Sequence, residues 1–233
     1  MGVVETIALT MGIAWASGIN LYATIATLGL LGATGNIDLP PDLEILMDPL
    51  VIGAAGFMYC VEFFVDKTPG VDSGWDTIHT FIRIPAGAVL AAGGVGDVGA
   101  GAELAAIIAG GTLAGSTHFT KAGTRLAINI SPEPVTNWTA SILEDIAVIA
   151  GLWAALHHPI VFLVALGAFI LLMIWLLPKI WRALRAVYRK LQSLFGGKPA
   201  ATQENPRQGP AGTVNTPAEA GFSLSLKSEG PDK

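Results

Sequence analysis

The chain has 233 residues, of which 52% are hydrophobic and only 13% are charged, and its formal net charge is −5 at pH 7. Because a typical soluble domain carries about 25% charged residues, this composition excludes an ordinary soluble globular protein and favours an integral membrane protein. The negative net charge and the scarcity of basic residues outside one C-terminal stretch also argue against nucleic acid as a partner.

Six apolar segments follow one another along the chain. A helix that spans a bilayer needs about 20 mainly apolar residues, and the candidates are 5–32, 48–66, 75–95, 102–128, 138–156 and 159–178. We therefore predict an all-α transmembrane domain over 1–178, with about six transmembrane helices and the lipid bilayer as its surroundings. Pro85 interrupts the third segment, so that segment either spans fully or re-enters.

The first segment, 5–32, contains an asparagine near its middle. Asn20 lies in the stretch WASGINLY, and two interpretations are open. Its side chain forms a hydrogen bond to a neighbouring helix, or the residue marks a break in the first helix. The hydrogen bond is the favoured interpretation, because amide side chains commonly bond between membrane helices.

Lys and Arg are confined to one set of connections. Lys67, the C-terminal part of 102–128 and the run 179–190 contain them. The connections that contain neither are 33–47, 96–101 and 157–159. Since short cytoplasmic loops carry an excess of Lys and Arg, we expect the first set to face the cytoplasm. With six spans in the inner (plasma) membrane, both termini are then expected to be cytoplasmic.

Two parts of the chain share one order of features. Shifting the sequence by 63 residues aligns Pro69 with Pro132 and Trp75 with Trp138. Each copy has a helix with a polar end, a turn with proline, a Trp and a second apolar helix. We interpret them as two related helical hairpins, at about 48–95 and 102–156. Such repeats often enclose a site in transporters, although duplication also occurs in proteins that carry nothing.

Ten ionisable side chains lie within these apolar segments or at their ends. Asp76, His79 and Arg83 have the spacing i, i+3, i+7 and share one helix face, and the fourth segment repeats this spacing. An ionised group at the bilayer centre costs about 2.5–3.5 kcal/mol, so these side chains must pair or line a wet cavity. The candidate ligand-binding or ion-pair cavity comprises Glu62, Asp66, Asp76, His79, Arg83, His118, Lys121, Arg125, Glu144 and Asp145.

Two functions are compatible with these charges. In the first, they line a cytoplasm-facing cavity of a transporter or binder of a small polar, ionic or lipid-headgroup ligand, or pass protons through His79 and His118. In the second, the protein is a scaffold that transports nothing, and its C-terminal segment recruits partners. The ion pairs are then structural, and they join Glu62, Arg83, Arg125 and Glu144. The oligomeric state stays open.

The sequence gives enzymatic chemistry no positive support. It contains no HExxH, no GxSxG, no Walker loop and no cysteine pair, so we expect no enzyme, no catalytic residues, no cofactor and no metal site. An intramembrane enzyme with His118 or His79 as the base is a third alternative.

The stretch beyond Pro178 changes character. In KIWRALRAVYRKLQSLF, apolar residues at helical spacing lie opposite Arg182, Arg185 and Arg189. This predicts a basic amphipathic juxtamembrane helix over 179–197 that lies on anionic lipid, with a solvated extension of the sixth helix as the alternative. The remainder, 198–233, is predicted to be a disordered cytoplasmic tail because it has few large apolar residues.

Two stretches, FFVDKTPGVDSGWDTIHTFIRIPAG and STHFTKAGTRLAINISPEP, resemble a known family. It consists of multi-pass membrane proteins, mostly bacterial, that are catalogued only as a domain of unknown function. The resemblance covers about residues 10–178 and implies a small apolar membrane protein with two polar turns; it implies no activity. The matching motif positions in the first stretch are Asp66, Lys67, Pro69, Gly70, Asp72, Trp75, Asp76, His79, Thr80 and Arg83. Those in the second are His118, Lys121, Gly123, Arg125, Asn129, Ser131, Pro132 and Pro134.

Overall fold

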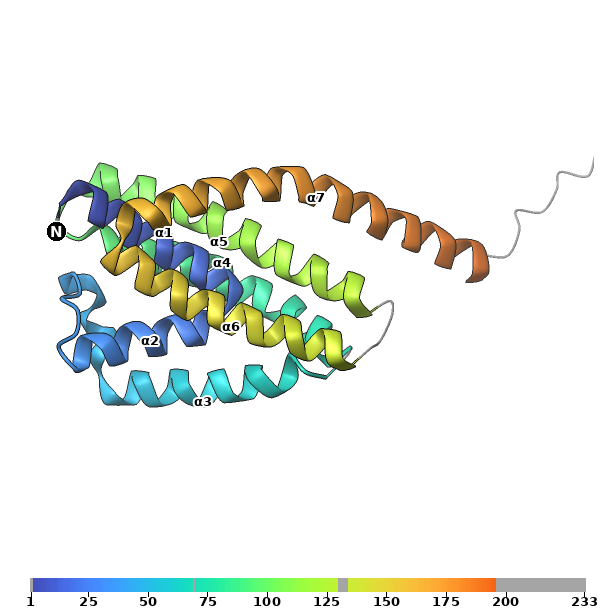
Figure 1. Cartoon of the computed structure of the whole chain (residues 1–233), viewed down its shortest axis with the longest axis horizontal. Coiled ribbons are helices and arrows are strands. Elements are labelled where there is room, and N and C mark those ends of the chain that lie inside the picture. The colour runs from blue at the N-terminus through green and yellow to red at the C-terminus, as the bar shows by residue number, and fades with distance from the viewer. Residues whose placement is uncertain (1, 69, 130–133, 196–233) are drawn as a thin grey trace, which may run out of the picture. The chain divides into compact units, whose positions relative to one another are not determined.

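The computed structural model describes residues 2–68, 70–129 and 134–195, and every regular element in them is a helix (Figure 1). Within the described residues, the helices up to Lys190 pack together as one unit. The elements are α1 (Val3–Ile19), α2 (Leu21–Ala33), the 3-10 helix η1 (Pro41–Met47), α3 (Pro49–Val65), α4 (Val71–Val95), α5 (Ala100–Asn129), α6 (Pro134–His157) and α7 (Pro159–Phe195). The all-α prediction is confirmed for these residues. The predicted disordered tail, 198–233, lies outside them.

The first apolar segment is two helices instead of one. Asn20 has φ −146° and ψ 99°, an extended conformation that ends α1 and begins α2. Its backbone N–H donates to the carbonyl of Ala16, and its side-chain oxygen accepts from the N–H of Ala23 over 2.9 Å. Asparagine suits this place because it satisfies an N–H that has no partner within the helix. The predicted single helix over 5–32 is therefore wrong.

After the break, α2 leads the chain back toward the end at which α1 begins. Residues 38–40, which follow α2, surround one cavity of about 290 Å³ together with Thr6 of α1 and residues 94–96 at the end of α4. The two helices thus form an N-terminal hairpin, residues 3–33, whose tip is Asn20 (Figure 1). Asn20 is only 2% exposed, so the tip lies inside the bundle.

The other helices run alternately between two ends of the bundle. One end, called the acidic end, contains 34–48, 96–99 and His158, and these residues include several Asp and Glu but no Lys or Arg. The opposite end, called the basic end, contains 66–68, Gly70 and Asn129, the last residue of α5. There α5 ends beside the start of α4, to which it is hydrogen-bonded.

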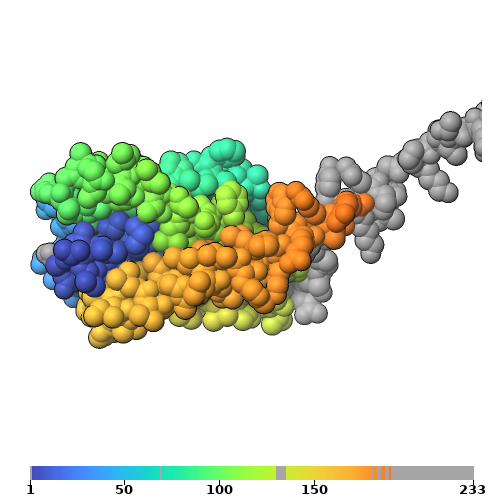
Figure 2. Space-filling model, turned by 90° about the horizontal axis from the view of Figure 1, so that it is seen from above, coloured from blue at the N-terminus to red at the C-terminus, as the bar shows by residue number. Residues whose placement is uncertain are grey.

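The last helix, α7, extends over 37 residues and continues through its internal proline. Near its start the ring of Phe162 lies 6.0 Å from that of Trp15 in α1. Further along, Trp181 lines a cavity together with Leu126 of α5. The helix therefore runs from the acidic to the basic end along α1 and α5 (Figure 2). The described part of the predicted juxtamembrane helix, 179–195, continues α7 without a break.

Several helices are long and apolar enough to cross a membrane. By length and composition these are α4, α6 over 135–157 and α7 over 159–179, and a fourth span results if η1 and α3, which meet at 68°, are counted as one. The helix α4 is continuous through Pro85, as the fully spanning alternative requires. The 30 residues of α5 are not in this set, since glycine, threonine and ionisable residues lower their mean hydropathy. The apolar helices indicate a membrane protein.

At the centre of the bundle, α1 contacts α2, α4, α5 and α6. Leu9 and Ile13 of α1 pack in an apolar core with Leu28 of α2 and Leu152 of α6. Near the C-terminus of α1, Gly18 allows the backbones of α1 and α5 to approach closely, because a Cβ atom there would overlap the carbonyl oxygen of Ala114 in α5. This packing carries the hairpin tip into the interior.

The helices do not pair as the predicted hairpins require. The main neighbours of α4 are α5 and α1, whereas α3 packs chiefly against α2. Consecutive helices α3 and α4 touch little, as do α5 and α6. The arrangement of two related hairpins and the internal repeat are therefore not confirmed.

Candidate functional site

One connected set of ion pairs joins side chains from α3 to α6. Lys121 of α5 lies at its centre, with Nζ 2.8 Å from Asp66 Oδ2 and 3.2 Å from Glu62 Oε1. The same Nζ is 3.6 Å from Glu144 Oε2. We call this set the charged network; its members are Glu62, Asp66, Asp76, Arg83, Lys121, Arg125 and Glu144.

Two arginines extend the network on either side of the lysine. Arg83 pairs through Nη2 with Glu62, and its Nη1 lies 3.5 Å from Asp76 Oδ1. Arg125 binds Glu144 through two donors, with Nη2 2.6 Å from Oε2 and Nε 3.3 Å from Oε1. Bidentate arginine–carboxylate pairs of this kind are among the strongest charge-assisted hydrogen bonds.

The network surrounds the tip of the N-terminal hairpin. The carbonyl oxygen of Ile19, the last residue of α1, accepts hydrogen bonds from Arg83 Nη1 and from Lys121 Nζ, both over 3.1 Å. The last carbonyls of a helix lack intrahelical partners and carry partial negative charge, so the break supplies an acceptor for two cations. Asn20 also donates to Asp145 Oδ1 over 3.2 Å. Both sequence interpretations of Asn20, break and interhelical bond, hold.

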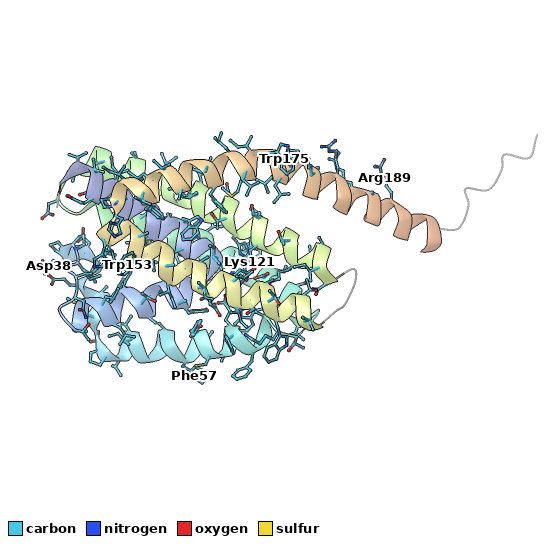
Figure 3. The ribbon with its side chains drawn as sticks, in the orientation of Figure 1. Asp38, Phe57, Lys121, Trp153, Trp175 and Arg189 are labelled. Atoms are coloured by element: carbon cyan, nitrogen blue, oxygen red, sulfur yellow. The ribbon has the colours of Figure 1, made fainter. Side chains whose placement is uncertain are left out.

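The members of the network are withdrawn from the surface. Glu62, Arg83 and Arg125 are fully buried, and Figure 3 shows Lys121 within the bundle while Phe57 and Trp175 project outward. Removing one partner of such a pair leaves an uncompensated buried charge, which typically costs about 3–5 kcal/mol. The network therefore holds α3, α4, α5 and α6 to one another at this level.

The hydrogen bonds of His118 make its ring neutral in this arrangement. His118 has Nε2 3.1 Å from the backbone oxygen of Asp76 and Nδ1 3.3 Å from Arg83 Nη1. Since a carbonyl only accepts, Nε2 carries the proton, and Nδ1 accepts from the guanidinium. For His79 only one nitrogen is assigned: Nδ1 donates to the Trp75 carbonyl over 2.9 Å, whereas Nε2 lies beside the Tyr22 hydroxyl, which can donate or accept.

Several polar residues outside the predicted set contribute to the site. The hydroxyl of Tyr22 lies 3.0 Å from His79 Nε2, and Asn137 accepts from Arg125 through its backbone oxygen over 3.1 Å. Asn137 is 1% exposed. A buried amide in an apolar helix is the sequence signal that could have indicated it. The contribution of Ile19 comes from the backbone, for which the sequence carries no signal.

A cavity gives access to one side of the network. It has a volume of about 340 Å³, lies between α1, α5, α6 and α7, and is lined by Trp15, Thr120, Lys121, Leu143, Glu144 and Phe169 among others. We call it the α5–α6 cavity. The side chain of Glu144 is 20% exposed. The site thus consists of a network of ion pairs with one accessible edge, and it combines features of the two arrangements that the sequence left open, a cavity and structural ion pairs.

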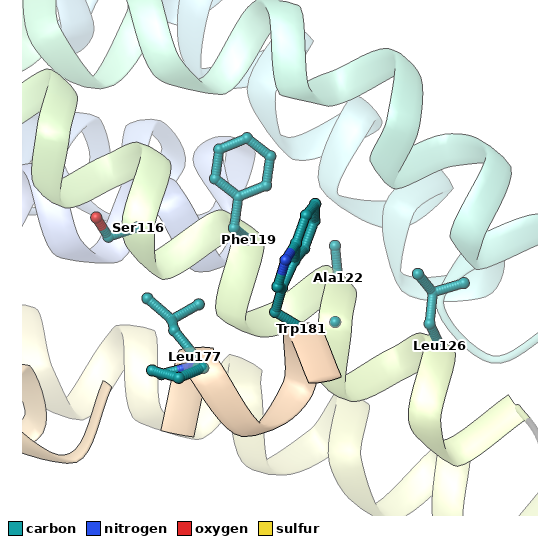
Figure 4. A pocket seen from close by; sticks show the side chains of 8 residues that line it. Ser116, Phe119, Ala122, Leu126, Leu177 and Trp181 are labelled. Carbon is teal, nitrogen blue, oxygen red and sulfur yellow. The ribbon is translucent and has the colours of Figure 1, made fainter. Parts of the chain in front are cut away.

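A second cavity, of about 580 Å³, lies between α5 and α7 (Figure 4). Its walls are mostly apolar, and Phe119, Leu126, Leu177 and Trp181 form much of them. A cavity of this character suits an acyl chain better than a polar solute. We therefore place the candidate site at the charged network and the α5–α6 cavity.

The ten predicted side chains lie in one region of the bundle. Seven form the network, His79 and His118 lie beside Arg83 and Asp76, and Asp145 holds the hairpin tip. Among the described residues, no group of three or more His, Cys, Asp or Glu side chains is arranged to hold a metal ion.

Comparison with curated proteins and with solved structures finds no match. The family described as Domain of unknown function (DUF4126) matches residues 7–179. This range contains every member of the charged network and the tip of the N-terminal hairpin. The chain therefore belongs to the DUF4126 family of domains of unknown function.

Proposed function

We propose that the protein binds a small polar or ionic solute at the charged network and carries it across the membrane. The observation that carries this proposal is the buried helix break at Asn20, where the Ile19 carbonyl meets Arg83 and Lys121. Broken helices whose ends meet charged groups in the membrane interior are typical of transporter binding sites.

The α5–α6 cavity supports the proposal because it reaches the network. Its volume of about 340 Å³ falls within the range of about 300–1,000 Å³ that is usual for small-molecule sites. A solute that enters it meets Lys121 and Glu144 first, a cation and a carboxylate only 3.6 Å apart. A zwitterionic solute, or a charged solute that takes the place of Lys121 or Glu144 in this ion pair, fits this edge best.

The distribution of basic residues supports one orientation. Lys67 and, on α7, Lys179 and Arg182 belong to the basic end, so by the positive-inside rule we propose that this end faces the cytoplasm. Because the chain turns back at Asn20, Val3 then lies on the opposite side of the membrane. This revises the expectation that both termini are cytoplasmic, which depended on a first segment that crosses once.

A second candidate function is a scaffold that moves no solute. The burial of Glu62 and Arg83 favours it, because pairs of this kind also occur where charge serves only to join helices. In this case the exposed Arg182, Arg185 and Arg189 of α7 bind anionic lipid, and the C-terminal segment recruits partners. Neither candidate assigns a catalytic role to the site.

Flux into proteoliposomes tests the first candidate. The solutes are alanine, succinate, inorganic phosphate and choline, which represent zwitterions, dicarboxylates, inorganic anions and organic cations. We expect flux of one class above that of empty vesicles, its loss in Glu144→Gln and its retention in Glu103→Gln. Glu103 is a matched control because it is an exposed carboxylate on α5 at the acidic end. No flux for any of the four classes would reject transport in favour of the scaffold.

A further inference from the structure

The charged network has one carboxylate more than it has cations. Its four carboxylates and three cations are Glu62, Asp66, Asp76, Glu144, Arg83, Lys121 and Arg125. A buried charge without a counter-charge is costly, and a buried ionisable group usually responds by becoming neutral. One additional positive charge would balance the network.

Asp76 is the carboxylate with the weakest pairing. Among the described residues its only cation within 4 Å is Arg83, whose Nη1 is 3.5 Å from Oδ1, a long distance for a hydrogen bond. That Nη1 also donates to the Ile19 carbonyl over 3.1 Å. The Oδ2 atom of Asp76 is buried and has no hydrogen-bond partner in the described part of the chain, and the residue is 1% exposed.

The other three carboxylates are better compensated. Glu62 lies within 4 Å of Arg83 and Lys121. Asp66 and Glu144 each lie within 4 Å of both Lys121 and Arg125. The excess negative charge is therefore concentrated at Asp76.

The surroundings of Asp76 include groups of both signs. Burial opposes its ionised form most; Lys121 and Arg83 favour that form, whereas Asp66 and Glu62 oppose it. Among the contacts described, α1 contributes the Ile19 carbonyl, which accepts a hydrogen bond from Arg83, the cation beside Asp76. The titratable and charged groups around Asp76 come from four helices. They are His79 and Arg83 of α4; His118, Lys121 and Arg125 of α5; Glu62 and Asp66 at the end of α3; and Tyr22 of α2.

We propose that Asp76 is a proton-binding site and that its carboxyl group holds one proton at neutral pH. In the binding step a hydronium ion transfers its proton to Oδ2; an O–H bond forms there, and a water molecule is released. The carboxyl group becomes neutral, which leaves three carboxylates against three cations in the network.

Other assignments of the missing charge fit the geometry less well. His118 already donates from Nε2 and accepts from Arg83 at Nδ1, so a second ring proton would point at a guanidinium. A metal ion needs several converging oxygen ligands, and no group of three carboxylate or histidine side chains in the described residues is arranged for one. A proton needs only one buried oxygen. Glu62 Oε2 and Asp66 Oδ1 also have no hydrogen-bond partner in the described part of the chain, but each of those carboxylates has two cations within 4 Å, whereas Asp76 has one.

The role of this proton rests on the proposed function. Arg83 contacts both Asp76 and the hairpin tip at Ile19. Loss of the proton restores the charge of Asp76, strengthens its attraction for Arg83 and so weakens the bond from Arg83 to the tip. The proton is thereby linked to the position of the N-terminal hairpin, which makes it the coupling ion for solute movement.

Infrared spectroscopy of the purified full chain tests the proton site directly. A protonated carboxyl group gives a C=O band distinct from that of a carboxylate. We expect this band at neutral pH in the unmodified protein and its disappearance on titration to alkaline pH. Asp76→Asn should lack the band, whereas Asp72→Asn should keep it. Asp72 is the matched control because it is also buried but accepts hydrogen bonds from Gly70 N, Ser73 N and Asn129 Nδ2.

Three results would overturn the inference. The first is absence of the band from the unmodified protein at neutral pH, a result that does not depend on the folding of any variant. The second is persistence of the band in Asp76→Asn. The third is stabilisation of the unmodified protein, but not of Asp76→Asn, by Na⁺ or K⁺ relative to choline at equal ionic strength, which would make the bound cation an alkali metal ion. These outcomes do not depend on flux. If the band is present but no solute flux is measured, the proton site is supported and the transport proposal is rejected. If flux is measured but the band is absent, transport is supported and the proton site is rejected.

Discussion

The Nη1 atom of Arg83 lies 3.1 Å from the carbonyl oxygen of Ile19, the last residue of α1. A cation on α4 thus caps a helix from another part of the chain. Positive charge is favourable at the C-terminal end of a helix, and the same guanidinium pairs with Glu62. The break in the first segment and the charged network consequently stabilise each other.

Arg83→Ala should destabilise the protein strongly. The substitution leaves Glu62 and Asp76 with less positive charge in a buried site, so we expect a loss of about 3–5 kcal/mol. Thermal unfolding in one detergent at one pH measures it. Arg182→Ala is the control: Arg182 is exposed and, among the described residues, bonds only within its own helix, and its loss should stay within about 0.5 kcal/mol. Equal unfolding temperatures for both variants would contradict a stabilising role of the pair.

Asn20→Ala should cost more than the loss of a helix cap alone. The variant loses the cap on the Ala23 N–H and the bond to Asp145, for which we expect about 2–3 kcal/mol in unfolding free energy. Asp48→Ala is the matched comparison, because Asp48 caps α3 through the Leu50 N–H but is exposed; its loss should be about 1 kcal/mol. If the two variants lose the same stability, the bond to Asp145 contributes nothing.

The sequence predicted the composition of the site better than the path of the chain. The spacing of Asp76, His79 and Arg83 indicates one face of a helix, and the cost of charge in a bilayer requires partners for it. These two arguments identify the side chains that the network joins. They do not identify the Ile19 carbonyl, since every residue has a backbone carbonyl. Only the helix break leaves the Ile19 carbonyl free to accept hydrogen bonds from Arg83 and Lys121.

The break itself could not be derived from the local sequence. Asn20 lies in a long apolar run, and one polar residue there fits a continuous helix as well as a broken one. The partner that fixes the side chain is Asp145, 125 residues further along. The predicted hairpins were not confirmed for a related reason: turns with similar residues do not determine neighbours, and α4 packs against α5 and α1 more than against α3.

Gly18→Ala should destabilise the packing of α1 on α5. A methyl group at Gly18 would overlap the Ala114 carbonyl oxygen and crowd Thr117, and overpacking of this kind costs about 1–3 kcal/mol. Gly53→Ala is the control: Gly53 lies in α3 with no atom near its Cβ position, and alanine there should be neutral or gain up to about 1 kcal/mol from its helix propensity. Chemical unfolding of both variants gives the comparison; a stabilised Gly18→Ala would mean that the two helices are further apart.

The N-terminal hairpin predicts that Val3 and Arg182 lie on opposite sides of the membrane. Both residues are exposed, at the acidic end and on the basic part of α7 respectively. In a Cys60→Ser background, Val3→Cys and Arg182→Cys should react with a membrane-impermeant maleimide from different sides. Asp97→Cys, at the acidic end, is the control and should react from the same side as Val3→Cys.

If Val3→Cys and Arg182→Cys react from the same side, the first segment crosses the membrane once. In that case the Ile19 carbonyl is no longer a helix end, and the transport proposal loses the observation that carries it. If they react from opposite sides, α1 enters the membrane from one side and α2 returns to that same side before α3 begins. The tip at Asn20 is then held within the membrane by Arg83, Lys121 and Asp145, and those bonds are what a bound solute or proton must alter to move it.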